Sequence, residues 1–226
     1  MVGSNIYYSF SGSTSVFLTD PNGTNLGPAF TVTVPGAVGI ASIASDGQFL
    51  YLTLIGATAM SPVNENVYKY DFAGNLVAPP VTLIPSAGLV QGFRSGLEFV
   101  DNTFVANQPR GDIGPYDKFD ATTGGLITPA FLDPGTFGFT GVAFDGAFYY
   151  VFDDEADPSQ LVVFNASGAF VKRLTLLGLP GPNDQAMIWD LSAVVAAVPE
   201  PPSLVLLAAA GAVFAMISYR RLCAAA

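Results

Sequence analysis

The chain has 226 residues, with 24 Gly, 17 Pro, one Cys and no His. The absence of histidine excludes Ser-His and Cys-His nucleophile pairs, histidine metal ligands and a histidine pH switch. The formal net charge of −10, with only 8 Lys and Arg residues, offers no basic surface for phosphates, so we expect no nucleic-acid partner. The content of Gly and Pro favours short strands joined by turns, and we expect an all-β fold.

Paired strand and turn signals recur through residues 5–195. An apolar strand, an Asp-Gly or Asp-Asn turn and an aromatic strand follow one another in residues 39–54, 95–108 and 140–153. A second strand-turn-strand pattern follows each of them, at 67–77, 116–127 and 161–171, and an early copy of it lies at 15–27. The repeating unit therefore contains four strands.

The repeat has the length of a propeller blade. The turn residues Asp20, Asp71, Asp120 and Asn165 are separated by 51, 49 and 45 residues. The sequence of these repeats resembles that of NHL-type and YVTN-type propellers, and the resemblance implies a β-propeller. We predict about four blades, with a β-sandwich of short hairpins as the alternative.

The two ends of the repeat region complement each other. The pattern of residues 5–34 is typical of a blade without its inner strand, and that of residues 186–195 is typical of a single inner strand. The two segments could therefore form one blade together and close the ring of the propeller. Because no basic, apolar leader precedes the strand at residues 5–10, we also expect that the natural start lies upstream, with a signal peptide and room for further blades.

The C-terminal region carries an apolar segment. Residues 201–219 contain no charge, and Leu204 to Tyr219 would rise about 24 Å as a helix against a bilayer core of roughly 30 Å. Arg220 and Arg221 follow and should stay cytoplasmic by the positive-inside rule. We predict a repeat domain at 1–196, a linker at 197–203, a transmembrane helix with its Arg-Arg stop at 204–221 and a tail at 222–226. A buried core helix is the alternative interpretation.

The sequence Val-Pro-Glu-Pro at 198–201, the apolar segment and the Arg-Arg pair together resemble the PEP-CTERM protein-sorting signal of Gram-negative bacteria. The resemblance implies export, membrane retention and recognition of Pro199, Glu200 and Pro201 by an exosortase. It further implies delivery to the cell envelope or an extracellular polysaccharide matrix such as a biofilm. Cys223 and the three alanines after it match a C-terminal prenylation motif, and the apolar segment could also belong to a GPI-anchor signal. The apolar helix argues against prenylation, and the Arg-Arg pair after it argues against a GPI signal, so both favour the sorting signal.

Candidate binding residues in the repeats are few. An acidic run could supply oxygen ligands to calcium, a weak candidate that lacks EF-hand spacing, and no other cofactor is expected. Its members are Asp153, Asp154, Glu155 and Asp157. Asn22 and Asn165 begin glycosylation sequons, and residues 110–112 spell Arg-Gly-Asp, although each of these motifs also fits a polar turn.

The sequence is compatible with three classes of function. We favour an exported structural or ligand-binding surface protein, against a propeller enzyme acting on polysaccharide or a calcium-stabilised adhesin. An enzyme would need converging carboxylates such as Asp46, Asp101 and Asp145, yet one acid per repeat is more typical of turns. Several aromatic residues could stack on sugars, but we expect them in the cores between blades. They are Tyr51, Tyr68, Tyr70, Tyr149, Tyr150 and Trp189.

Overall fold

The computed structural model describes residues 5–10, 12–58, 61–85, 94–108, 115–135, 139–153 and 160–176, except for the side chains of residues 139 and 140. These residues form fifteen β-strands and one short 3-10 helix, η1 (Pro62–Glu65). The predicted sorting signal, transmembrane helix and tail lie outside the described residues, as does the strand expected at 186–195. Within the described ranges, no helix is long and apolar enough to cross a membrane.

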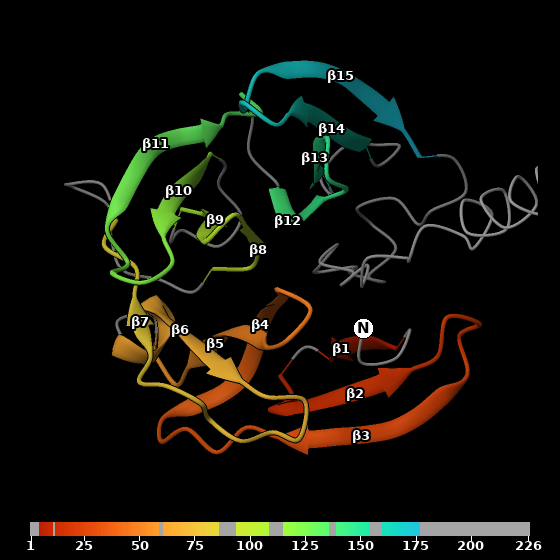
Figure 1. Ribbon diagram of the computed structural model, residues 1–226, viewed down its shortest axis with the longest axis vertical. Helices are drawn as coiled ribbons and strands as arrows, with labels where there is room; N and C mark the ends of the chain where they lie inside the picture. The colour runs from red at the N-terminus through yellow and green to blue at the C-terminus, as the bar shows by residue number, and fades with distance from the viewer. Residues whose placement is uncertain are drawn as a thin grey trace, which may run out of the picture. The chain divides into compact units, whose positions relative to one another are not determined.

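The strands form four separate antiparallel sheets, coloured in chain order in Figure 1, which we call blades 1 to 4. Blade 1 contains β1 (Ile6–Ser9), β2 (Ser15–Thr19) and β3 (Asn25–Thr31). Blade 2 contains β4 (Ala37–Ser45), β5 (Leu50–Gly56), β6 (Asn66–Tyr70) and β7 (Val81–Thr82).

Blade 3 contains β8 (Leu97–Val100), β9 (Thr103–Asn107), β10 (Tyr116–Asp120) and β11 (Leu126–Leu132). Blade 4 contains β12 (Phe139–Phe144), β13 (Phe148–Asp153), β14 (Gln160–Asn165) and β15 (Phe170–Thr175). In all four sheets each strand pairs with its neighbours in sequence, so every blade is an up-and-down meander.

The first strands of successive blades lie together. β4 contacts β8, β8 contacts β12, and β1 of the incomplete blade 1 contacts β4. Four meanders stacked through their inner strands make a four-blade propeller fold, which confirms the fold expected from the repeats. The β-sandwich alternative is wrong, because no described strand of one repeat pairs with a strand of another.

Three apolar cores fill the spaces between successive blades. The core between blades 1 and 2 includes Tyr7, Val16, Ile43, Leu52, Tyr68 and Tyr70. The core between blades 2 and 3 includes Tyr51, Val67, Leu97, Phe104 and Phe119, and that between blades 3 and 4 includes Val105, Tyr116, Tyr149, Val151 and Phe164. These cores cover both faces of blades 2 and 3 and one face each of blades 1 and 4, and the burial of their large side chains holds successive blades together.

The aromatic residues predicted for these cores are found there. Tyr51, Tyr68, Tyr70 and Tyr149 are all buried in the inter-blade clusters, which confirms the structural interpretation for them. Tyr150 is half-buried, and its hydroxyl donates to Asp145 Oδ2 at 2.7 Å. Trp189 lies outside the described residues.

Candidate functional site

The predicted carboxylates of the enzyme interpretation belong to turns. Asp46 Oδ1 accepts hydrogen bonds from the amides of Gln48 and Phe49, at 2.8 and 2.7 Å, and Tyr51 Oη donates to Asp46 Oδ2 at 2.8 Å. Desolvation by burial, followed by the hydrogen bond to Asp46, raises the pKa of Tyr51 above its ordinary value of 10.0. This turn joins the first two strands of blade 2.

Blade 4 repeats the same arrangement. Asp145 Oδ1 accepts from the amides of Ala147 and Phe148, both at 2.8 Å, and Asp145 Oδ2 accepts from Tyr150. The Tyr150 hydroxyl, together with these amides, lowers the pKa of Asp145 below the ordinary value of 3.8. A carboxylate held ionised by its own turn serves folding, as the repeat position suggested.

Asp101 lies in the corresponding turn of blade 3, but this turn has a different geometry. Asp101 and Asn102 have φ angles of 49° and 57° and form a two-residue turn between the paired residues Val100 and Thr103. Asp46 and Asp145 instead lie in longer connections, between Ser45 and Leu50 and between Phe144 and Phe148. All three acids therefore lie in the turn between the first two strands of their blades, as expected, but the turn of Asp101 is shorter than the other two.

The weak calcium candidates are only partly within the described residues. Asp153 is buried and forms an ion pair with Arg173, whose Nη1 lies 3.4 Å from Asp153 Oδ2. Asp154, Glu155 and Asp157 lie outside the described residues, as does the Arg-Gly-Asp sequence. No group of three or more possible metal ligands occurs within the described part of the chain.

The sequons lie at turns. Asn165 Oδ1 accepts from the amides of Ser167 and Ala169, both at 3.0 Å, and from the Ser167 hydroxyl at 2.7 Å. Asn22 is exposed in the equivalent turn of blade 1, where its amide donates to Asp20 Oδ1 at 2.9 Å. The side chain of Asn165 therefore stabilises its own turn, whereas in blade 1 the side chain of Asp20 has that role and Asn22 takes part through its backbone amide.

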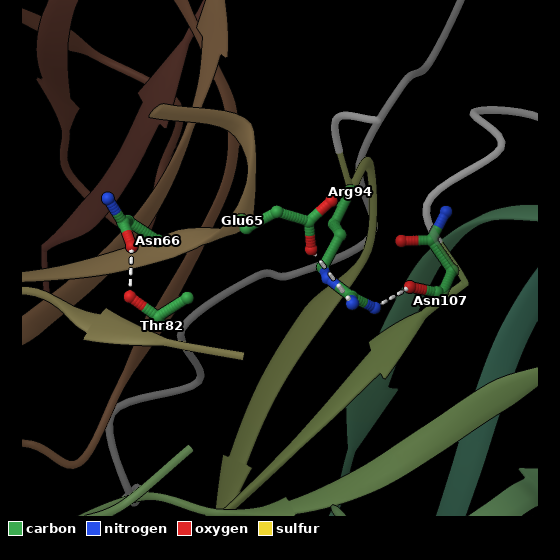
Figure 2. A network of polar contacts seen from close by, with 5 residues as sticks. All are labelled: Glu65, Asn66, Thr82, Arg94 and Asn107. Carbon is green, nitrogen blue, oxygen red and sulfur yellow. Dashed lines mark hydrogen bonds and ion pairs between the residues drawn. The ribbon is translucent and has the colours of Figure 1, made fainter. Parts of the chain in front are cut away.

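A buried polar cluster that the sequence did not reveal lies between blades 2 and 3 (Figure 2). Arg94, which is fully buried, donates from Nη1 to the Asn107 carbonyl at 2.6 Å, and its Nη2 lies 3.3 Å from Glu65 Oε2. Its guanidinium also lies 5.0 Å from the centre of the Phe119 ring. Asn107 fastens the same segment, because its Nδ2 donates to Ser95 Oγ at 2.9 Å.

The electrostatics of this cluster are set by burial. Desolvation lowers the pKa of Arg94 from its ordinary value of 12.5, while the carboxylates of Glu65 and Asp117 act in the opposite direction. Asp117 is buried as well, and its Oδ1 accepts from the Ala130 amide at 2.8 Å. Ala130 has a φ of 49°, at an irregularity in the pairing of β10 with β11. The cluster ties η1 to blade 3.

A second feature that the sequence analysis missed is a groove of about 710 Å³ between blades 2 and 3. The volume is within the range of roughly 300 to 1,000 Å³ that small-molecule sites occupy. Aromatic, proline and threonine residues line it, and Lys69 is the one charged residue among the lining residues. The sequence signals were the Pro79-Pro80 pair, which interrupts the fourth strand of this repeat, and a lysine two residues before the turn residue Asp71.

Comparisons with known proteins concern the fold alone. No protein-family model matches the chain, and no curated protein matches it. Among solved structures, a nidogen/laminin complex is similar with a TM-score of 0.49 and 16% identity, over 76% of this chain and 60% of that one. Hydrazine synthase of Kuenenia stuttgartiensis has a TM-score of 0.46 and 16% identity, over 76% of this chain and 46% of that one. The chain thus spans 60% or less of the length of these two.

A third solved structure resembles the chain with a comparable TM-score and identity. The dihydro-heme d1 dehydrogenase NirN has a TM-score of 0.45 and 14% identity, over 78% of this chain and 36% of that one. The description of the present chain as a propeller therefore rests on its own strand pairing and inter-blade cores.

Proposed function

We propose that the chain is an exported protein of structural or ligand-binding type, displayed outside the cell by its propeller and sorted by its C-terminal segment. The observation that carries the proposal is the order of three features: Pro199-Glu200-Pro201, an uncharged apolar segment, and Arg220-Arg221. This order resembles the PEP-CTERM signal, whose partners are the membrane and an exosortase. Extracellular polysaccharide is the matrix in which the propeller would act.

The chemistry of the motif suits recognition at a membrane surface. The two prolines fix φ and lack backbone donors, so the segment is suited to an extended linker between the repeats and the apolar helix. Glu200 is the one charge between Asp190 and Arg220. A single acid at the outer end of an apolar segment gives an exosortase one charge to bind.

The described residues support a binding or structural role more than catalysis. Asp46 and Asp145, two of the three carboxylates considered for an enzyme, accept hydrogen bonds from their own turns. The groove between blades 2 and 3 offers a place for a ligand without requiring an acid-base pair.

The proposal is tested by the variant Glu200→Ala, with Asp190→Asn as the matched control, in a host that contains an exosortase. The chain is expressed behind an added signal peptide. The wild type and the control should leave the inner membrane and reach the cell surface, whereas Glu200→Ala should remain in the membrane with its propeller folded. Equal surface amounts for wild type and Glu200→Ala would contradict the sorting role of Glu200.

Topology is tested separately by adding protease to intact spheroplasts that express Glu200→Ala. Because the apolar segment precedes Arg220 and Arg221, the propeller should be outside and should be digested. Protection of the propeller would overturn the exported orientation.

A further inference from the structure

The groove between blades 2 and 3 exists because the outermost strand of blade 2 leaves its ladder. The Val77 amide still donates to the Lys69 carbonyl at 2.9 Å, and pairing resumes only where Val81 faces Val67. Between them lie Ala78, Pro79 and Pro80, and the prolines have no N–H with which to continue the ladder. β7 is therefore only two residues long, and the detour opens the side of β6.

The equivalent position of blade 3 shows the contrast. Lys118 lies two residues before the turn residue Asp120, as Lys69 lies two residues before Asp71, and its Nζ is 4.9 Å from the centre of the Phe131 ring. Phe131 belongs to β11, a strand of seven residues that pairs with β10 on both sides of an irregularity. Both lysines are half-buried, but Lys118 lies against a side chain of the outer strand of its blade, whereas Lys69 lines a groove.

The ammonium group of Lys69 makes cation–π contacts with two aromatic rings. Its Nζ lies 4.0 Å from the centre of the Phe49 ring and 5.4 Å from that of Tyr51. The ion pairs among the described residues join Arg94 to Glu65 and Arg173 to Asp153, and neither involves Lys69. In a chain of net charge −10, this places one localised cation, without an acidic partner among the described residues, in a ligand-sized groove.

The rest of the lining combines apolar surfaces with polar groups. Pro79, Pro80 and the exposed Ile84 give the lining apolar surface. Phe99 adds an aromatic ring, which stacks on Tyr51 with ring centres 4.7 Å apart. Asn102 and Thr122 add an amide and a hydroxyl. Flat apolar walls with a few hydrogen-bonding groups and one cation suit a sugar ring that carries a carboxylate, because such a ring has an apolar C–H face, hydroxyls and an anion.

We propose that this groove binds an acidic sugar residue of a polysaccharide, with its carboxylate on the Lys69 ammonium and its ring against the walls formed by Pro79, Pro80 and Phe99. The inference deepens the ligand-binding part of the proposed function by naming a ligand class and a site. It does not depend on the sorting signal, because binding can be measured on the purified chain.

The test measures binding of tetragalacturonate to the purified full chain by calorimetry, with neutral maltotetraose and tetraglutamate as comparison ligands. The wild type should bind tetragalacturonate more tightly than either comparison ligand, and added salt should weaken the binding. Lys69→Gln should weaken it about tenfold or more, because a hydrogen bond to a charged group is lost. Lys69→Arg, which keeps the charge, should retain binding.

Lys118→Gln is the matched control, because Lys118 has the same repeat position and an aromatic neighbour but does not line this groove. It should leave the affinity for tetragalacturonate unchanged, and near-ultraviolet circular dichroism should show that all variants keep the wild-type fold. Absence of tetragalacturonate binding by the wild type, or equal binding by Lys69→Gln, would overturn the proposal. Equal or tighter binding of tetraglutamate would assign the groove to acidic peptides, and equal binding of maltotetraose would remove the role of the carboxylate.

Discussion

Single side-chain oxygens organise the outer turns of all four blades. In blade 3, Asp120 Oδ1 accepts hydrogen bonds from the Thr122 and Thr123 amides at 3.0 and 2.7 Å. In blade 4, Asn165 Oδ1, an uncharged amide oxygen, accepts hydrogen bonds from the amides of its own turn in the same way. Asp20 and Asp71 act similarly in blades 1 and 2. The turn therefore needs an acceptor oxygen at this position, and a charge strengthens the bonds that this oxygen accepts.

The charge makes the turn of blade 3 sensitive to acid. Hydrogen bonds from the Thr123 amide and then its hydroxyl lower the pKa of Asp120 below the ordinary 3.8. A lowered carboxyl pKa stabilises the fold above the pKa of the unfolded chain, and this stabilisation is lost as the pH falls through the folded pKa. Asp120→Asn should therefore lower the Tm at pH 7, and its difference from wild type should shrink toward pH 3. A difference that stays constant over this range would contradict the linkage.

Gly124, in the same turn, is constrained by the neighbouring blade. It has a φ of +70°, and a Cβ there would overlap the Thr82 carbonyl oxygen of blade 2. Gly23 has a φ of +84° in the equivalent turn of blade 1, and a Cβ there would meet no atom within 4 Å. Gly23→Ala should cost about 1 to 2 kcal/mol of unfolding free energy, for the backbone conformation alone.

Gly124→Ala should cost about 2 to 5 kcal/mol, because the overlap adds to the same backbone term. Denaturant unfolding of the two variants measures the difference. Equal losses would show that the contact between the blade 3 turn and blade 2 relaxes without strain.

At the scale of elements, the hairpins could be predicted and the irregular segments could not. The predicted hairpins of residues 15–27, 116–127 and 161–171 correspond to β2–β3, β10–β11 and β14–β15. They were recognisable because Gly and Asp or Asn mark the turns and apolar residues mark the strands. The prediction of a hairpin at residues 67–77 in blade 2 was only partly right. Leu76 forms a single bridge with Tyr70, and Pro79 and Pro80 then interrupt the strand.

The two candidate sites depend on contacts between elements that are distant in sequence. Glu65 and Arg94 are 29 residues apart, and nothing in the sequence near either one indicates an ion pair. Lys69 likewise becomes part of a groove only because residues 78–80 detour and because Phe99 and Thr122 of blade 3 lie opposite. Local patterns reveal turns and strands, whereas such sites follow from how the blades pack.

The Arg94 cluster predicts strong coupling between η1 and the segment that enters β8. Arg94→Met would leave the buried carboxylates of Glu65 and Asp117 without their cation and should cost about 3 to 5 kcal/mol of unfolding free energy. The double variant Arg94→Met/Glu65→Leu should be less destabilised than the sum of the two single variants. Urea unfolding measures this coupling, and additive losses would mean that the two side chains act independently.

At the scale of the whole molecule, the exposed edges of the blades limit association between copies. Pro28 lies in β3 and Pro129 in β11, both of which are outermost strands. Proline interrupts the donors that an added strand would need, and β15 carries Lys172 and Arg173 instead. Together with the net charge of −10, these edges suit a propeller that presents its surface to other molecules without adding strands to itself.

The sequence of the C-terminal segment predicts where this propeller works. Pro199-Glu200-Pro201 precedes the apolar segment, so an exosortase that recognises the motif would separate the propeller from Leu204 to Tyr219. The linker and the described repeats would then leave the membrane together. The groove with Lys69 would be carried with them into the polysaccharide matrix.

The most direct test is the intact mass of wild-type chain recovered from the cell surface of a host that contains an exosortase. If the exosortase cuts at the motif, this mass should lack the apolar segment and everything after it, including Arg220, Arg221 and Cys223. The same measurement in a host without the exosortase should give the uncut chain in the inner membrane. Recovery of the uncut chain at the surface of the first host would contradict processing at Pro199-Glu200-Pro201.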